Sequence, residues 1–257
     1  MTTATLPQPV PHRMALPDGP RRIVWGMVAY GPYPYSPVYM SHMRAIAYTS
    51  RHCETTLTGD SKIAGVGASD RMYTHSAENR IVEDFLSLPD ATHLFLTEMD
   101  MVLPHDALVK LLALDKPIAS GLYFLRGGDG QPCLYAKSIT PASNPYPHSP
   151  VTGFPTETPF KLGTLGGCPG LGCVLIAREV FERIEKPWFD LKEYGYGSDM
   201  YFYTKVRDAG FEVWVDPTVR CGQMDTVCYS YEDYEARLKR EPGFRGHGFI
   251  ITEESAA

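Results

Sequence analysis

A chain of 257 residues is long enough for one large α/β domain or for two small ones. Its 44% apolar and 21% charged residues argue against disorder outside the two ends, and its net charge of −6 disfavours a surface generally coated with nucleic acid. Six cysteines without a C-x-x-C pair favour reduced thiols over a disulfide framework or a zinc site. We expect a cytoplasmic protein with no transmembrane segment.

The first half of the chain alternates between predicted strands and helices. Residues 1–20 are rich in proline and are expected to form a flexible tail. Beyond the tail, the apolar patterns predict strands at 22–30, 62–66, 93–97 and 118–124, and helices at 36–52, 76–88 and 106–114. This alternation is typical of an α/β domain whose mostly parallel, Rossmann-like sheet is flanked by helices.

The pattern changes at 126–167, which is rich in Pro, Ser, Thr and Tyr and shows little periodicity. We expect a mobile lid or acceptor-binding loop there, with a disordered insertion that has no role as the alternative. Regular structure is then predicted as strands at 174–177 and 211–215 and helices at 179–184, 197–209 and 230–241, before a frayed end at 251–257.

Two carboxylates, Glu98 and Asp100, follow the apolar strand at 93–97. Residues two apart face the same way in a strand, so both side chains can converge on one point at the sheet edge where open α/β sheets bind ligands. Two hard oxygen donors suit Mg²⁺ or Mn²⁺. The alternative is a pair of solvated acids in a loop.

Three further features suggest contacts with a ligand. The first strand ends at Tyr30 and leads into an aromatic loop from Gly31, which could stack on a base or form a lid on the core. Gly170 and Gly172 fit neither the dinucleotide nor the phosphate-loop pattern, and they indicate a close approach of the backbone to a ligand or a tight turn. Trp188 could stack on a sugar or pack in the core.

Four blocks of sequence occur in order between roughly residues 22 and 225: Leu94–Met101, Gly170–Phe181, Pro187–Phe189 and Gly197–Phe211. Together they resemble the nucleotide-sugar-dependent glycosyltransferases with the GT-A fold, especially those of the family 2 type. The resemblance implies a single GT-A domain at 21–250, a Mn²⁺ or Mg²⁺ cofactor, and transfer of a sugar from a nucleoside diphosphate to an acceptor hydroxyl, with inversion.

The resemblance also implies roles for individual residues. Asp100 would bind the cation, with Glu98 beside it or on the ribose of the donor. Asp199 would be the catalytic base, and its place at a helix N-terminus would keep it ionised. The acceptor would lie between Gly170, Gly172, Trp188 and the segment 126–167.

Several positions depart from the pattern of the family. Gln223 stands where a histidine often ligates the metal, and His247 could replace that ligand, with Arg245 near the phosphates. Ser198 stands where a glutamate usually precedes the base. Polar contacts to the nucleotide are implied for Asn79 and Arg80, in a helix where Glu78 replaces a frequent arginine; Tyr30 and Gly31 are assigned to the donor side as well.

Two other functions stay open on the sequence alone. A nucleotidyltransferase of the same fold would use the metal-binding acids but would leave Asp199 without a task. A non-catalytic module that binds nucleotide sugars or glycans would fit the departures at Ser198 and Gln223. The sequence leaves open the donor, the oligomeric state and the acceptor, which could be a saccharide, a lipid, a metabolite, a protein or a modified DNA base.

Overall fold

The structure, a computed structural model, describes residues 20–29, 36–55, 62–69, 72–126, 130–137, 148–162, 167–191, 197–225, 228–241 and 249–250. The helices are α1 (Ser36–Thr55), α2 (Thr74–Leu86), α3 (Ala107–Ala113), α4 (Arg178–Arg183), α5 (Ser198–Asp208) and α6 (Tyr231–Arg240). The strands are β1 (Arg22–Val28), β2 (Lys62–Ser69), β3 (His93–Glu98), β4 (Met101–Val102), β5 (Ile118–Leu122), β6 (Leu134–Lys137), β7 (His148–Gly153), β8 (Phe160–Lys161), β9 (Cys168–Pro169), β10 (Cys173–Ala177), β11 (Trp214–Arg220), β12 (Gly222–Met224), β13 (Cys228–Tyr229) and β14 (Phe249–Ile250).

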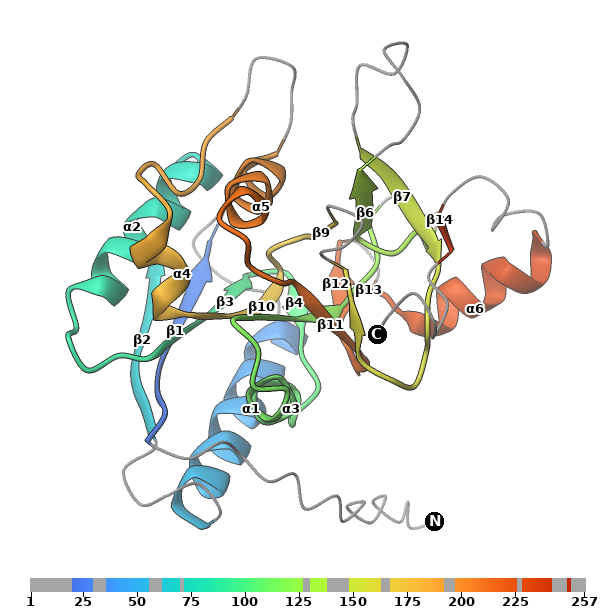
Figure 1. The fold of residues 1–257 in the computed structure, drawn as a ribbon. Coiled ribbons are helices and arrows are strands. Elements are labelled where there is room, and N and C mark those ends of the chain that lie inside the picture. The colour runs from blue at the N-terminus through green and yellow to red at the C-terminus, as the bar shows by residue number, and fades with distance from the viewer. Residues whose placement is uncertain are drawn as a thin grey trace, which may run out of the picture.

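The central sheet has seven strands in the order β2-β1-β3-β10-β5-β11-β8 (Figure 1). β1 is parallel to β2 and β3, and β5 is parallel to β11, whereas β10 and β8 run antiparallel to their neighbours. The expected mixed α/β class with a mostly parallel sheet is therefore confirmed. β10 is reversed because the chain leaves β5 and returns at the same sheet edge, where the Gly170 N–H bonds to the Cys133 carbonyl and the Cys133 N–H to the Tyr123 carbonyl.

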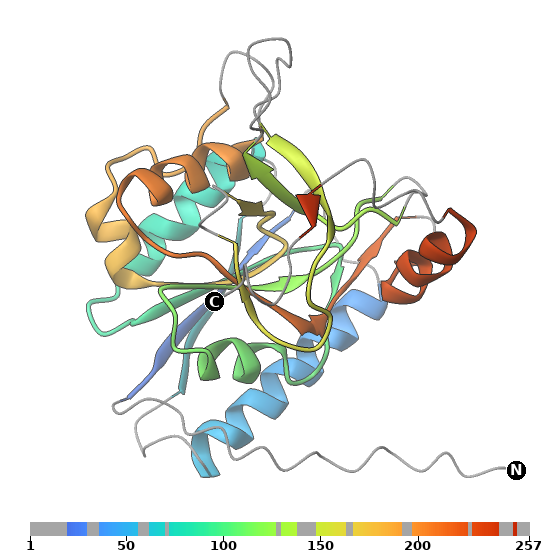
Figure 2. The same cartoon turned by 45° about the vertical axis from the view of Figure 1, so that its right-hand side comes forward.

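Helices cover both faces of this sheet. α2, α4 and α5 pack on one face against Val24, Leu94 and Ile176, and α1 and α3 pack on the other against Trp25 and Phe95. Alternate residues of each central strand thus enter different cores, as the period of two requires. Figure 2 shows α1 and α3 below the sheet and the other three helices above it.

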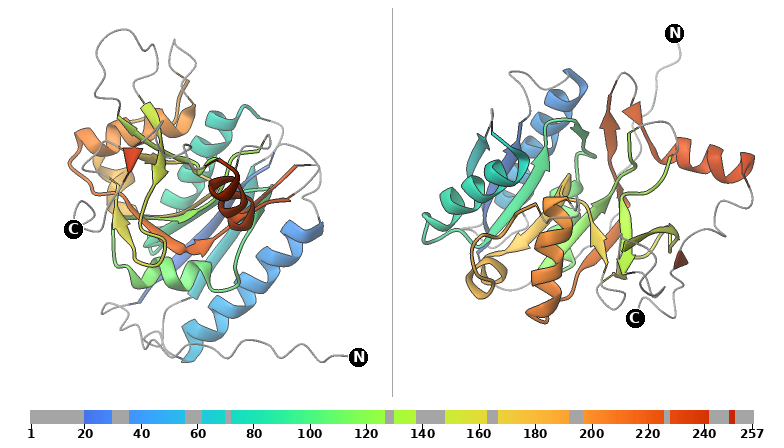
Figure 3. Two further views of the ribbon diagram at one scale, coloured as in Figure 1. Left: turned by 90° about the vertical axis from the view of Figure 1, so that its right-hand side faces the viewer. Right: turned by 90° about the horizontal axis from the view of Figure 1, so that it is seen from above.

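The segment 126–167 was expected to be a mobile lid or acceptor-binding loop. Where the structure describes it, this segment contains the strands β6, β7 and β8. β6, β7, β9 and β14 form a second sheet, and a third apolar core, which includes Leu134, Val151 and Phe160, joins this sheet to α6 and to the central sheet. Viewed from above, α6 lies at the opposite end of the molecule from α2 (Figure 3). Residues 127–129, 138–147 and 163–166 lie outside the described part of the chain.

A third, small sheet of order β13-β12-β4 closes the edge where β3 ends. Its pairing places Gln223 opposite Met101, directly after Asp100. None of these short strands was expected from the sequence, because two or three residues carry no periodic signal. Within the described residues, no helix combines the length and the apolar character that crossing a bilayer requires.

Candidate active site

A cleft of about 250 Å³ opens where β3 ends and α2 and α5 begin. The polar residues of its lining come from the N-terminal parts of the two helices and from the end of β3, and its apolar wall comes from three separate loops. The lining residues are Thr74, Glu78, Glu98, Tyr123, Leu171, Leu191, Gly197, Ser198 and Asp199. The cleft therefore collects three carboxyl groups from three different elements.

Asp199, the expected base, lies in this cleft as the second residue of α5, and its Oδ1 accepts the N–H of Met200 at 2.7 Å. Burial raises the pKa of Asp199, although hydrogen bonds from backbone N–H groups, including that of Met200, lower it in part. The helix N-terminus was expected to keep this carboxyl ionised; in the structure the effect of burial on its pKa is larger than that of these hydrogen bonds and has the opposite sign. A raised pKa makes the carboxylate a better proton acceptor.

Glu78 is the most deeply buried of the three acids, with 1% of its surface exposed. The hydroxyl of Ser198 donates a hydrogen bond to its carboxyl group, while Oε2 has no hydrogen-bond partner among the described residues. Burial, opposed by the Ser198 bond and reinforced by the charges of Glu98 and Asp199, raises the pKa of Glu78 to about 8. Two departures from the family pattern, at Glu78 and Ser198, thus bond to each other.

Sequence reasoning did not assign a role to Glu78. One signal was available, because Glu78 stands three residues before Ile81 and four before Val82, on the face of α2 that packs on the sheet. A carboxyl group on such a face is buried, and a buried carboxyl calls for a partner. Ser198, which supplies that partner, is 120 positions away in the sequence.

Asp100 is 3% exposed and faces Gln223 rather than the cleft lining. The Gln223 Nε2 donates to Asp100 Oδ2 at 3.2 Å, and Arg126 forms an ion pair with the same oxygen at 3.3 Å. Burial raises the pKa of Asp100, while the charge of Arg126 and the bond from Gln223 oppose the rise. Arg126, which is half exposed, was not predicted as a site residue.

Two oxygens beside this ion pair, Asp100 Oδ1 and Gln223 Oε1, are buried and have no hydrogen-bond partner among the described residues. A carboxylate and an amide oxygen are donors that Mg²⁺ and Mn²⁺ accept, so these residues fit the expected cation. No group of three or more His, Cys, Asp or Glu side chains in the described part of the chain is arranged to hold a metal ion. Glu98 and Asp100 were expected to lie together at the cation. In the structure Glu98 lines the cleft, whereas Asp100 contacts Gln223 and Arg126.

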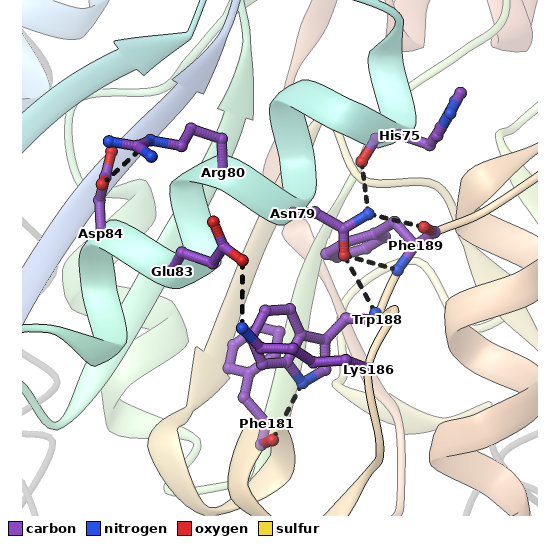
Figure 4. A network of polar contacts seen from close by, with 9 residues as sticks. All are labelled: His75, Asn79, Arg80, Glu83, Asp84, Phe181, Lys186, Trp188 and Phe189. Atoms are coloured by element: carbon purple, nitrogen blue, oxygen red, sulfur yellow. Dashed lines mark hydrogen bonds and ion pairs between the residues drawn. The ribbon is translucent and has the colours of Figure 1, made fainter.

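Asn79 and Trp188, expected to contact the donor and the acceptor, belong to the scaffold (Figure 4). The Asn79 amide donates to the carbonyls of His75 and Phe189, both at 2.7 Å, and its Oδ1 accepts the N–H groups of Trp188 and Phe189. These four bonds use the hydrogen-bonding capacity of the amide. Trp188 is 3% exposed and packs on Phe181, so the core-packing alternative describes it. Neither residue lines the cleft.

The other expected contacts vary in position. Arg80 pairs with Asp84 one helical turn away, with 60% of its side chain exposed, and does not line the cleft (Figure 4). Gly170 and Gly172 let the backbone approach Tyr123: a Cβ atom at Gly170 would overlap the Tyr123 hydroxyl, and one at Gly172 would lie 2.9 Å from the Met101 sulfur. The backbone at both glycines therefore lies close to other protein atoms. Leu171, between them, lines the cleft. Tyr30, Gly31, Arg245 and His247 lie outside the described residues.

The fold is similar to that of A197 from STIV, with a TM-score of 0.52 and 15% identity over 92% of this chain and 96% of that one. Other structures also match, among them two with lower scores. GalNAc-T7, solved with UDP, GalNAc and Mn²⁺, gives 0.49 and 13% identity over 86% of this chain and 48% of that one. The inositol-1-phosphate CTP transferase from T. maritima gives 0.42 and 15% identity over 88% and 98%. Similarity to A197 at this identity shows a shared fold.

A scan against protein-family models gave no match. A comparison with curated protein sequences gave none either. The fold and the site define a class, an α/β protein of mostly parallel sheet with an acid-lined cleft at the sheet edge.

Proposed function

We propose that this chain is a glycosyltransferase that moves a sugar from a nucleoside diphosphate to an acceptor hydroxyl, with inversion. The observation that carries the proposal is the pair of unpartnered buried oxygens on Asp100 and Gln223, beside a cleft that holds Asp199. GT-A resemblance and the neighbour solved with UDP, GalNAc and Mn²⁺ agree with this choice of substrate.

We propose that the two clusters serve one reaction, and the short chain distance between them supports this. Glu98 lines the cleft and Asp100 follows two residues later, so their Cα atoms are at most about 7 Å apart. Asp100 and Gln223 would hold Mn²⁺ or Mg²⁺, which when bound supplies Lewis-acid stabilisation of the leaving diphosphate. Arg126 adds a guanidinium at the same place, half exposed and able to contact a phosphate. Arg245 and His247 are proposed to contribute from the C-terminal segment.

Asp199 acts on the acceptor. As the acceptor oxygen bonds to the anomeric carbon, the bond from that carbon to the diphosphate oxygen breaks, and the hydroxyl proton passes to the Asp199 carboxylate. The pKa raised by burial favours this transfer. One base on the face opposite the leaving group is sufficient for a single displacement, which inverts the anomeric centre.

Calorimetric titration of UDP-sugars with and without Mn²⁺ tests the division of roles. We expect Asp100→Ala to remove the dependence of donor binding on Mn²⁺, because it deletes the buried carboxylate. Asp199→Asn should keep donor binding and lower transfer by about 10² to 10⁴-fold, as loss of a general base does. Arg80→Ala is the control, since its exposed side chain lies outside the cleft.

The products distinguish the alternatives. Free nucleoside diphosphate with a glycosylated acceptor supports the proposal, whereas release of pyrophosphate from a nucleoside triphosphate would identify a nucleotidyltransferase. Donor binding without turnover would identify a binding module. Equal donor binding by wild type and Asp100→Ala at all Mn²⁺ concentrations would contradict the assignment of the cation site.

A further inference from the structure

Arg126 reaches Asp100 from a different strand of the central sheet. Its backbone directly follows Leu125, whose N–H bonds to the Gln131 carbonyl at 2.8 Å beyond the end of β5. Asp100 follows β3, and β10 separates β3 from β5 in the sheet. The ion pair between Arg126 Nη1 and Asp100 Oδ2, at 3.3 Å, therefore joins segments that follow two different strands.

The two partners of Asp100 differ in how firmly they are held. Gln223 lies in β12, which pairs with β4, and the N–H of Met224 bonds to the Asp100 carbonyl at 2.7 Å, so the backbones of Asp100 and Gln223 are fixed to each other. The Arg126 side chain, by contrast, is 50% exposed, against 4% for Asp100. An ion pair with an exposed partner is weak, and a long side chain gains rotamer freedom when it is released. Arg126 is the member of this cluster that can leave.

The guanidinium and the proposed cation would share one carboxyl group. The free donors for the cation are Asp100 Oδ1 and Gln223 Oε1, whereas Asp100 Oδ2 carries Arg126. A cation on Oδ1 and a guanidinium on Oδ2 would place two positive charges on one buried group, where solvent screens them little. Asp225, the other charged residue that acts on Asp100, is an acid and adds no positive charge.

A diphosphate removes this conflict. Two protein donors leave most of the coordination shell of Mg²⁺ or Mn²⁺ to water and phosphate oxygens. A guanidinium binds phosphate oxygens with the same paired geometry that it uses for a carboxylate. With the diphosphate present, Arg126 can release Asp100 and still keep a negative partner.

We propose that Arg126 holds Asp100 in the donor-free protein and moves to the diphosphate when the cation and the donor bind. The inference rests on the proposed function, because it concerns the same cation and donor. It makes the two ligands cooperative, since the diphosphate draws away the guanidinium that opposes the cation. By linkage, the cation strengthens diphosphate binding by the same factor.

Removal of the guanidinium should change two affinities in opposite directions. Without a diphosphate, Arg126→Ala should bind Mn²⁺ about two- to fivefold more tightly than wild type, the effect of losing an exposed ion pair that competes for Asp100. With Mn²⁺ present, the variant should bind the diphosphate about tenfold or more weakly, as loss of a hydrogen bond to a charged group does. A purely structural contact would weaken both affinities or neither.

The electron paramagnetic resonance signal of free Mn²⁺ measures the first affinity, and calorimetric titration measures the second. The probes are Mn²⁺ alone and a panel of UDP, GDP, CDP, ADP and dTDP, with the Mn²⁺ complex that each forms in solution subtracted. Arg207→Ala is the matched control, because Arg207 is 36% exposed, pairs with Asp208 and lies outside the cleft. It should follow wild type in both titrations.

Equal or weaker Mn²⁺ binding by folded Arg126→Ala overturns the inference, and so does unchanged diphosphate binding. Wild type gives a test that needs no variant: if no diphosphate of the panel strengthens Mn²⁺ binding, the exchange does not occur. The two proposals fail separately. Opposite effects without any sugar transfer contradict the proposed function alone, whereas sugar transfer with equal Mn²⁺ affinities contradicts the exchange alone. No Mn²⁺ binding by either protein, with or without a diphosphate, contradicts both.

Discussion

The burial of Glu78 in the cleft makes the stability of the fold depend on pH. Its carboxyl group is buried beside two other acids, and its pKa of about 8 lies above the ordinary value of 4.5. The folded state therefore holds a proton that the unfolded state has released between these two values. The stability that this proton provides is fully present below about pH 4.5 and is lost as the pH rises through 8.

We predict that the free energy of unfolding, measured with urea across this range, falls more steeply in wild type than in Glu78→Gln. The difference in slope should approach about 1.4 kcal/mol per pH unit at most, since one proton is involved. Gln keeps the size of the side chain and cannot titrate. Glu83→Gln, at an exposed position, should follow wild type, and identical slopes for wild type and Glu78→Gln would contradict the raised pKa.

At the scale of elements, α2 is fixed to the segment after α4 by one amide. Asn79 on α2 holds the backbone of Trp188 and Phe189, and Phe189 stacks on Phe202 of α5 at 4.8 Å between ring centroids. The two helices that supply Glu78 and Asp199 are thereby held in one packed unit. The sequence predicted both helices from their apolar spacing, but it did not predict this contact.

We predict that Asn79→Ala lowers the free energy of unfolding by about 2 to 4 kcal/mol, because two backbone N–H groups lose their acceptor and two carbonyls lose a donor. Arg80→Ala, the next residue, should cost under about 1 kcal/mol, since its ion pair is exposed. Urea unfolding measures both. Weaker nucleotide binding by folded Asn79→Ala, at unchanged stability, would restore Asn79 as a donor contact.

The sequence patterns predicted the long helices and strands, but not the features that depend on contacts between distant segments. Apolar spacing located α2 and β3, and the end of the strand pointed to Asp100, because a period and a strand end are local features. Asp199 was assigned only through the resemblance to a family. β6, β7 and the Asp100–Gln223 contact depend on pairing between distant segments, and short strands with Pro and Thr show no alternation. Trp188 could not be assigned for the same reason, since a tryptophan in a core and one in a site look alike in sequence.

At the scale of the whole molecule, the second sheet is joined to the first through a shared core. Leu122 of β5, Phe160 of β8 and Val215 of β11 pack with α6, so the central sheet contributes to this core. Tyr234 of α6 lies at its centre, stacked on Phe124 at 5.2 Å between ring centroids and donating its hydroxyl to the Thr152 carbonyl at 3.1 Å. Phe124 directly follows Tyr123, which lines the cleft.

We predict that this shared core makes the two sheets unfold together. Tyr234→Ala should then lower the free energy of unfolding by about 3 kcal/mol, as large-to-small changes of buried aromatics do. Probes in the two sheets should report the same decrease. Fluorescence of the three tryptophans reports on the central sheet, because Trp25 and Trp214 lie in it and Trp188 packs in the core on one of its faces. Hydrogen exchange in β6 and β7 reports on the second sheet. Tyr234→Phe, which keeps the ring, should lose about 1 kcal/mol. Faster exchange in β6 and β7 with unchanged fluorescence transitions would show instead that the second sheet opens alone, and Tyr123 would then be the residue through which its opening reaches the cleft.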